Sequence, residues 1–214
     1  CVAPDYIYCD REIKDELIRQ IQKQIKKQFG STPLNNKNYG KIINEKHFTR
    51  IHDLILPDKV VCGGDSNPET LQIAPTVMDN VTFEDAVMQE EIFGPVLPVL
   101  TYDSLDEAIE KVNSMAHPLA LYIFTSDKEA AEKVTSRCGF GGGCVNDTII
   151  HLATSEMGFG GFGESGMGSY HGKDGFHTFS HYKSIVDKKT WLDLPMRYQP
   201  YRKIYEKLLR KFLK

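Results

Sequence analysis

The sequence has no apolar run close to the ~20 residues that an α-helix needs to span a bilayer. It also has no CxxC pair, and its five cysteines (Cys1, Cys9, Cys62, Cys138 and Cys144) show no regular spacing. This pattern argues against a disulfide scaffold and favours reduced thiols in a cytoplasmic protein. The net charge of −3 gives no overall attraction to nucleic acid, and no zinc-finger or RNA-binding motif supplies a local one. We therefore expect no nucleic-acid partner.

The 214 residues, 41% of them apolar, are enough for one main core. Apolar residues recur every three or four positions from Asp10 to Phe29, which predicts an amphipathic helix that Asp10 caps and Gly30 ends. Strand patterns (Lys59–Cys62, Ile73–Met78, Gly94–Tyr102, Leu119–Thr125 and from Cys144) alternate with helical ones (Ile42–Ile55, Leu105–Met115 and Ser126–Arg137). This alternation predicts an α/β fold with a mainly parallel sheet and flanking helices.

Glycine dominates the segment from Met157 to Gly175, which predicts a long functional loop. Gly158, Gly160 and Gly163 satisfy the spacing G-x-G-x-x-G. A dinucleotide-binding loop must follow a strand and open a helix, whereas here no strand pattern precedes the glycines and more glycines follow them. The motif is therefore not interpreted as a phosphate-binding loop.

Two histidines, His177 and His181, have the i, i+4 spacing of a helical metal site. Neither a glutamate between them nor a cysteine pair accompanies them, so the pattern is not that of a zinc site. We expect no metal.

The segment Tyr198–Lys214 has the pattern of a helix with one apolar and one basic face. Such a helix could lie on an anionic membrane surface, or it could dock its apolar face on the protein body or a partner subunit. The second interpretation is favoured, because a charged outer face is the common solvated case.

Three segments carry a resemblance to a known family. Residues 1–6 read Cys-Val-Ala-Pro-Asp-Tyr, residues 90–96 read Glu-Glu-Ile-Phe-Gly-Pro-Val, and residues 158–173 form a glycine-rich stretch that ends Tyr-His-Gly-Lys. Together they resemble the aldehyde dehydrogenase superfamily, in its class 3 branch. The resemblance implies a catalytic domain over residues 1–183. Residues 184–214 would then form a bridging, oligomerising strand and the basic helix, and the dinucleotide-binding half would be absent from this chain.

The resemblance also implies the roles of individual residues. Cys1 corresponds to the nucleophile, whose thiolate suits addition to an aldehyde carbonyl. Glu91 and Phe93 correspond to the residues that hold the nicotinamide ribose of NAD or NADP. The aldehyde entrance would be lined by Ile149, Leu152, Phe159 and His171.

Further expectations concern partners. The family's oxyanion-binding asparagine and hydrolytic glutamate lie upstream of the nucleophile, so this chain alone is expected to be inactive without the N-terminal dinucleotide-binding half. A homodimer is expected by analogy. An N-terminal-nucleophile hydrolase, in which the α-amine of Cys1 acts as base, would need stacked antiparallel sheets that this pattern does not predict. A non-catalytic interaction fragment is the remaining alternative.

Overall fold

The computed structural model describes residues 1–200 and 202–212. The chain divides into two compact units, Cys1–Phe179 and Ser180–Lys214. The strands of the described residues all lie in the first unit, and the second contains α6 (Lys203–Phe212). The boundary predicted after Lys183 falls a few residues beyond this division.

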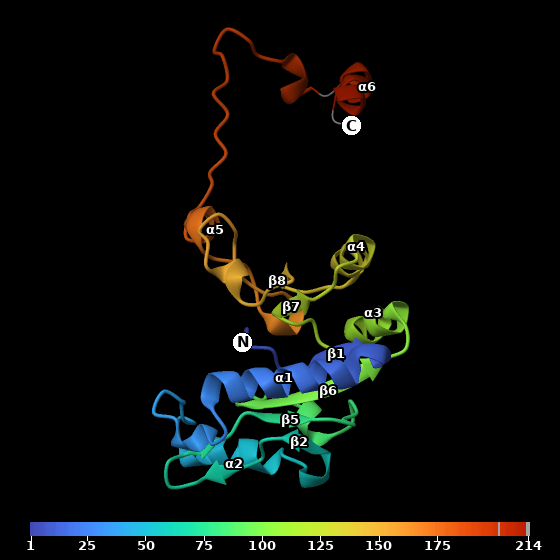
Figure 1. Ribbon diagram of the computed structural model, residues 1–214. Coiled ribbons are helices and arrows are strands. Elements are labelled where there is room, and N and C mark those ends of the chain that lie inside the picture. The colour runs from blue at the N-terminus through green and yellow to red at the C-terminus, as the bar shows by residue number, and fades with distance from the viewer. Residues whose placement is uncertain (201, 213–214) are drawn as a thin grey trace. The chain divides into compact units, whose positions relative to one another are not determined.

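A four-stranded sheet with the order β1-β6-β5-β2 forms the centre of the first unit (Figure 1). Its strands are β1 (Ile7–Asp10), β6 (Val96–Tyr102), β5 (Thr76–Met78) and β2 (Val60–Cys62). β6 pairs in parallel with both β1 and β5, and β2 pairs antiparallel with β5. The predicted α/β class with a mostly parallel sheet is confirmed.

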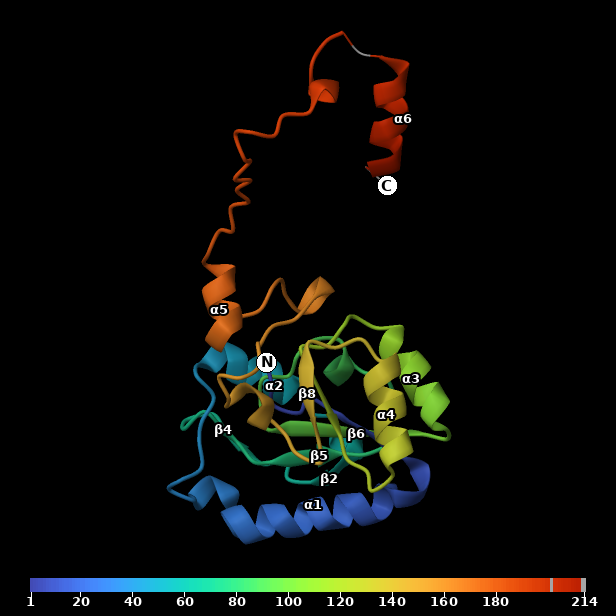
Figure 2. The same ribbon diagram turned by 90° about the horizontal axis from the view of Figure 1, so that it is seen from above.

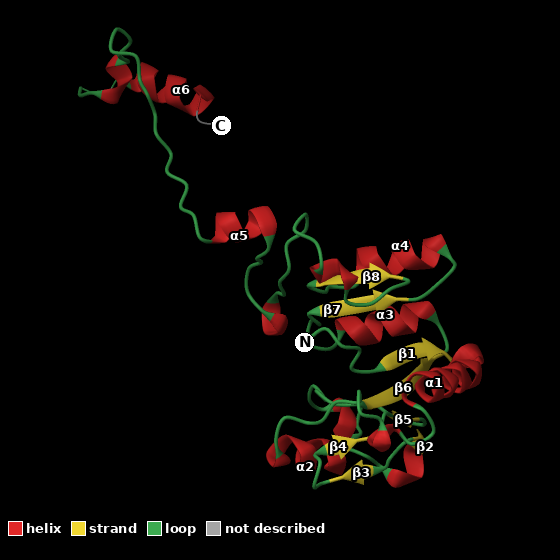
Figure 3. Ribbon diagram, turned by 60° about the vertical axis from the view of Figure 1, so that its left-hand side comes forward, coloured by secondary structure: helices red, strands yellow, loops and turns green. Residues whose placement is uncertain are grey.

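A second parallel pair, β7 (Ala120–Ile123) and β8 (Gly142–Val145), is connected through α4 (Lys128–Arg137). This pair lies beyond β1, on the side of the four-stranded sheet opposite β2 (Figures 1 and 3). Within the described residues, β1 pairs only with β6 and β7 only with β8. One backbone edge of β1 and one of β7 therefore carry no strand partner.

The two faces of the central sheet bury separate apolar clusters. α1 (Lys14–Phe29) contributes Ile18 to a cluster with Cys9, Val77 and Val99. On the opposite face, α2 (Glu45–Asp53) packs Phe48 and Ile51 into a larger cluster with strand residues. Figure 2 shows the two helices on opposite sides of the sheet. Side chains alternate between the faces because successive strand residues point in opposite directions.

Local capping explains where several helices begin and end. The Asp10 carboxylate accepts a hydrogen bond from the Glu12 N–H in a short 3₁₀ turn, and α1 ends at Gly30, which has φ +84°. α2 begins later than predicted because the side chain of Asn44 caps it by accepting from the His47 N–H. Ser104 likewise caps α3 (Leu105–Asn113), and Asp127 caps α4. The predicted helices are confirmed, with shorter bounds.

Two sequence predictions are wrong in part. The strand predicted from Ile73 to Met78 is divided: Gln72–Ile73 (β4) pairs with Ser66–Asn67 (β3), and β5 begins at Thr76. The division falls at Pro75, which has no N–H to donate to a ladder. The segment 157–175, predicted as a loop, contains a 3₁₀ turn (Gly163–Ser165). Its last residues belong to α5 (Gly172–Thr178). The sequence did not predict α5, because glycine has a low helix propensity.

In the second unit, α6 covers only part of the segment predicted as helix, and residues 201, 213 and 214 of that segment lie outside the described residues. Residues 184–189 pair with no strand in the described part of the chain. A search of the described residues finds no helix with the length and apolar character of a membrane span.

Replacement of Ile51 tests the larger core cluster. Ile51 is fully buried, so Ile51→Ala is expected to lower the free energy of unfolding by about 2–5 kcal/mol through lost burial and a residual cavity. Ile43, which is 82% exposed, is the matched control, and Ile43→Ala should change stability by less than about 0.5 kcal/mol. Urea unfolding followed by circular dichroism measures both. Equal losses would contradict this placement of the core.

Candidate active site

The parallel pairing of β1 with β6 brings two sequence motifs to one edge of the sheet. Ile7 pairs with Val99, so the segments that lead into these strands lie at the same end. Cys1 lies in the segment before β1, and Glu91 lies in the turn before β6. Cys1 N and Glu91 Oε1 are 4.0 Å apart, and both side chains are about two-thirds exposed. The two residues predicted to carry the nucleophile and the cofactor contact therefore meet.

Arg50 of α2 holds the backbone of the Glu90–Phe93 turn. Its guanidinium donates to Oε1 of Glu90 at 3.0 Å and to the carbonyl oxygens of Glu91 at 3.4 Å and Ile92 at 2.6 Å. Ile92 is buried, whereas Phe93 is 60% exposed and has a positive φ of 49°. The turn is anchored by one buried side chain and one cation, and it leaves the carboxylate of Glu91 and the ring of Phe93 accessible.

Gly94 completes the turn directly above the core. A Cβ added at this position would lie 2.8 Å from Cδ1 of Ile51, closer than carbon atoms approach. The absence of a side chain here lets the turn rest on α2.

Asp5 links the segment before β1 (residues 1–6, here called the nucleophile segment after the predicted role of Cys1) to the same turn. Its Oδ1 accepts a hydrogen bond from the Ile92 N–H at 2.9 Å. Burial raises the pKa of the Asp5 carboxyl, and the charge of Glu91 adds to the rise, while the Ile92 N–H and Arg50 oppose it. A partly desolvated carboxylate thus fixes the spacing between the two motifs.

The predicted aldehyde-binding residues fall into two groups. Phe159 and His171 stack with ring centroids 5.9 Å apart, and Phe159 pairs through its backbone with Tyr170. Ile149 and Leu152 lie on a separate turn after β8, where Ile149 has φ +67°. The buried His151 connects the groups, because its ring contacts Phe159 and belongs to the same turn. The structure places Phe159 and His171 together, and it places Ile149 beside the nucleophile segment through Tyr122.

Tyr122 of β7 makes that connection. Its hydroxyl donates to the carbonyl oxygen of Val2 at 2.6 Å, and the backbone N–H of Ile149 acts on the same hydroxyl and opposes the rise that burial causes in its pKa. The sequence analysis named neither Tyr122 nor Arg50 as a site residue. No local motif marks them, because each reaches the site from an element distant in sequence.

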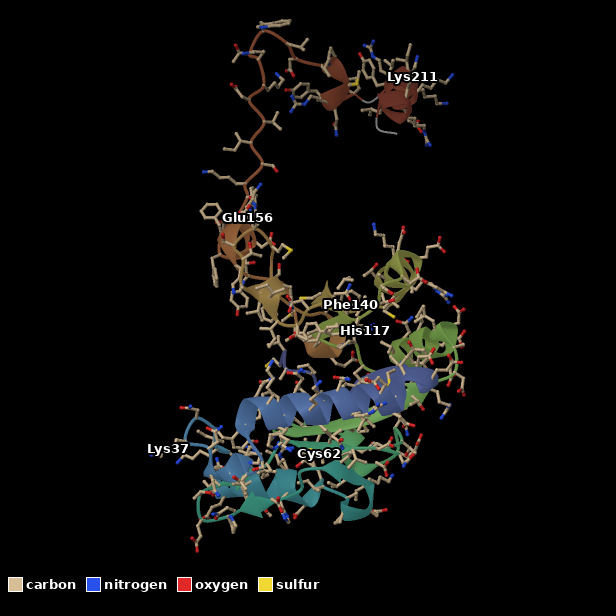
Figure 4. The ribbon with its side chains drawn as sticks, in the orientation of Figure 1. Lys37, Cys62, His117, Phe140, Glu156 and Lys211 are labelled. Carbon is tan, nitrogen blue, oxygen red and sulfur yellow. The ribbon has the colours of Figure 1, made fainter. Side chains whose placement is uncertain are left out.

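The other thiols differ from Cys1 in their surroundings. Burial raises the pKa of Cys9, Cys62 and Cys138 and so disfavours their thiolates. Cys62, labelled in Figure 4, packs against the α1 cluster, away from the motifs described above. Cys144 lies 3.5 Å from Nδ1 of His151. Cys1 is the exposed thiol among the five, all of which are unpaired.

The structure also bears on the histidine pair. α5 ends at Thr178, so His177 and His181 do not share a helix. Within the described residues, no group of three or more His, Cys, Asp or Glu side chains is arranged to hold a metal ion.

Comparison with known proteins identifies relatives over nearly the whole chain. The aldehyde dehydrogenase family model matches residues 1–185. The chain is 45% identical to 4,4'-diaponeurosporen-aldehyde dehydrogenase of Staphylococcus aureus, over 94% of this chain and 44% of that protein. It is 40% identical to aldehyde dehydrogenase family 3 member H1 of Arabidopsis thaliana, over 98% of this chain and 44% of that protein.

Two further comparisons agree. The dimeric NADP-preferring aldehyde dehydrogenase of Canis lupus familiaris is 42% identical over 94% of this chain and 45% of that protein. The solved substrate-bound state of Staphylococcus aureus AldH superimposes with a TM-score of 0.90 at 44% identity, and the match covers 100% of this chain and 47% of that one. The chain thus spans less than half the length of each of these four proteins.

The raised pKa of Asp5 predicts a pH-dependent effect of Asp5→Asn. The folded state holds the Asp5 proton more tightly than the unfolded state, so this group favours folding at low pH and loses that contribution as pH rises through its folded pKa. Asparagine stays neutral and can still accept from the Ile92 N–H. Asp5→Asn is therefore expected to raise the free energy of unfolding at about pH 7, and the gain should shrink toward about pH 4.

Urea titrations at both pH values measure this difference, with the exposed Asp58→Asn as control, expected to change stability by less than about 0.5 kcal/mol. A loss of stability at neutral pH in Asp5→Asn would show instead that the charge of Asp5 stabilises the turn.

Proposed function

This chain belongs to the aldehyde dehydrogenase family, and on that premise we propose that it is the catalytic portion of a class 3-like enzyme that oxidises aldehydes to carboxylic acids with NAD or NADP. The observation that carries the proposal is the meeting of Cys1 with the Glu91–Phe93 turn, where Cys1 N lies 4.0 Å from Glu91 Oε1. In this chemistry the nucleophile must lie beside the residues that hold the hydride acceptor, because both act on one reacting carbon.

Cys1 carries the covalent chemistry. Its thiolate adds to the carbonyl carbon of the aldehyde and forms a thiohemiacetal. Loss of hydride from that carbon gives a thioester, and water then cleaves the carbon–sulfur bond, which releases the acid and regenerates the thiol. NAD or NADP, when bound, supplies the hydride acceptor.

The exposed residues of the turn fit a nicotinamide ribose. The carboxylate of Glu91 can accept from both ribose hydroxyls, a charge-assisted contact. The exposed ring of Phe93 offers an apolar face against the same sugar. Asp5 and Arg50 hold this turn in place, so its two contact groups keep a fixed distance from Cys1.

The aldehyde is proposed to enter along Ile149, Leu152, Phe159 and His171. The stacked pair of Phe159 and His171 and the apolar turn at Ile149 supply an apolar surface. Such a wall favours aliphatic or aromatic aldehydes.

An N-terminal dinucleotide-binding half is proposed to complete the enzyme and to provide the hydrolytic glutamate and the oxyanion-binding asparagine. Two facts support it: the chain spans 44% of the length of the Staphylococcus aureus and Arabidopsis thaliana relatives, and the neighbouring edges of β1 and β7 lack strand partners among the described residues. Unpaired edges of buried strands are ordinarily filled or covered. Without that half, the chain is proposed to be inactive.

A homodimer in the cytoplasm is the proposed assembly. The dog relative is named as dimeric, and α6 exposes Ile204, Leu208 and Leu209 on its apolar side. The five unpaired thiols fit a reducing compartment. Peripheral contact of α6 with a membrane is the competing proposal, supported by its basic residues.

Two substitutions in the complete enzyme separate the two roles at the site. Cys1→Ser is expected to abolish NAD(P)H formation, because a hydroxyl is a far weaker nucleophile. Glu91→Gln is expected to raise KM for NAD(P) about tenfold or more, as loss of a charge-assisted hydrogen bond costs about 1.5–3 kcal/mol.

The matched control is Glu90→Gln, whose carboxylate bonds to Arg50 instead. Glu90→Gln should raise KM for NAD(P) less than about threefold, because the loss of an exposed ion pair changes the free energy only slightly. Steady-state absorbance at the nicotinamide wavelength measures all three variants. Equal effects of the two glutamate substitutions would refute the cofactor role of Glu91.

A charge on the apolar side of α6 tests the assembly. Leu208→Glu is expected to shift the protein from dimer to monomer in sedimentation experiments, because it places a carboxylate in an apolar contact. Lys207→Glu, which puts the same charge on the basic side, should leave the dimer intact. If the unaltered protein instead sediments with anionic vesicles and the Lys207→Glu variant does not, the result would favour membrane contact of α6 over the dimer.

A further inference from the structure

A single tyrosine hydroxyl joins the nucleophile segment to the predicted aldehyde wall. Tyr122 Oη donates to the Val2 carbonyl oxygen at 2.6 Å, immediately after Cys1 in the chain. The backbone N–H of Ile149 also acts on this hydroxyl, and the Tyr122 ring contacts His151 of the same turn with ring centroids 5.9 Å apart. Because one side chain contacts both backbone segments, a shift of either segment disturbs the other.

The turn after β8 that carries Ile149 has a strained backbone. Ile149 has φ +67° and ψ −34°, in a region that costs a β-branched residue about 1–2 kcal/mol. Asn146, at the start of the same turn, also has a positive φ of 59°. A strained backbone persists only where its surroundings fix it, and the contacts of this turn with Tyr122 are one such restraint.

The position of the hydroxyl is itself fixed. Tyr122 lies on β7 in register with Cys144 of β8, and its ring packs edge-on against the buried ring of His151 at 5.9 Å. A tyrosine hydroxyl is protonated at neutral pH, and burial raises the pKa of Tyr122 further, so the proton donated to Val2 stays on the hydroxyl. The phenol therefore acts as a rigid spacer between sheet and site.

We propose that Tyr122 is a positioning residue for aldehyde oxidation, which sets the distance between the nucleophile Cys1 and the aldehyde wall at Ile149 through its hydrogen bond to Val2 and its contacts with the turn that carries Ile149 and His151. This inference rests on the proposed function. Tyr122 touches neither reacting atoms nor cofactor. Replacement of Tyr122 should change only the kinetic parameters for the aldehyde, because Asp5 and Arg50 hold the cofactor turn without Tyr122.

Tyr122→Phe removes only the hydroxyl, and Tyr39→Phe is a matched control. Tyr39 also donates to a backbone carbonyl at 2.6 Å, that of Ile73, but it lies in another part of the fold. In the complete enzyme, Tyr122→Phe is expected to lower kcat/KM for an apolar aldehyde at least tenfold, since small misplacements of reacting groups cost up to about 10²-fold. KM for NAD(P) should stay within about twofold. Tyr39→Phe should change neither value more than about twofold, although it loses a comparable hydrogen bond.

Hydrogen exchange on this chain gives a readout that needs no activity. Tyr122→Phe should speed exchange in a peptide that contains Ile149 at least tenfold, whereas Tyr39→Phe should leave that peptide unchanged.

The outcomes separate the two proposals. If the unaltered enzyme oxidises aldehydes but Tyr122→Phe keeps its kcat/KM within twofold, the positioning role is overturned while the proposed function stands. The positioning role is likewise overturned if Tyr122→Phe unfolds at the assay temperature, since the hydroxyl then serves stability alone, or if both tyrosine variants lose activity equally. An unaltered complete enzyme with no aldehyde oxidation would overturn both proposals.

Discussion

The parallel pairing of β1 with β6 is the constraint on which the site depends. Its register, with Ile7 opposite Val99, fixes the ends of two segments that are ninety residues apart in sequence. Parallel neighbours place their preceding turns at the same edge, so the pairing alone brings Cys1 near the turn that holds Glu91. The buried residues on both faces of β6 then hold that strand against α1 and α2.

The contacts that refine this arrangement come from different elements. Arg50 reaches the turn from α2, Asp5 from the nucleophile segment itself, and Tyr122 from β7. Each hydrogen-bonds a backbone group, either a carbonyl or an N–H, so each positions the chain instead of entering the chemistry. The three contacts divide the proposed site into two parts: Asp5 and Arg50 hold the proposed cofactor turn, and Tyr122 contacts the proposed aldehyde wall.

The sequence predicted the elements whose signals are local. The apolar period of α1 and its end at Gly30 needed no tertiary information, whereas Asp10 caps the 3₁₀ turn before α1 and not α1 itself. The alternation of strands and helices predicted the α/β class. α5 was missed because its glycines oppose helix formation and only tertiary contacts compensate. The break at Pro75 was missed because the flanking residues read as one apolar run.

At the site, the motifs predicted which residues meet but not what holds them. Cys1, Glu91 and Phe93 were found through their sequence contexts, and the structure brings Cys1 and Glu91 together. The bond from Arg50 could not be predicted, since an arginine on an amphipathic helix has no distinguishing neighbours. The bridge through Tyr122 depends on how β7 lies beside the nucleophile segment, which no local pattern encodes.

One edge of β1 and one of β7 lack a strand partner among the residues that the structure describes, and this has a consequence for biosynthesis. A ribosome releases a polypeptide from its amino end, so in the proposed enzyme the dinucleotide-binding half emerges before either strand exists. That half can fold first and offer a template against which β1 and then β7 assemble as they leave the exit tunnel. In that proposed enzyme, the order of translation would shield two unpaired strand edges that this segment would expose if it were made by itself.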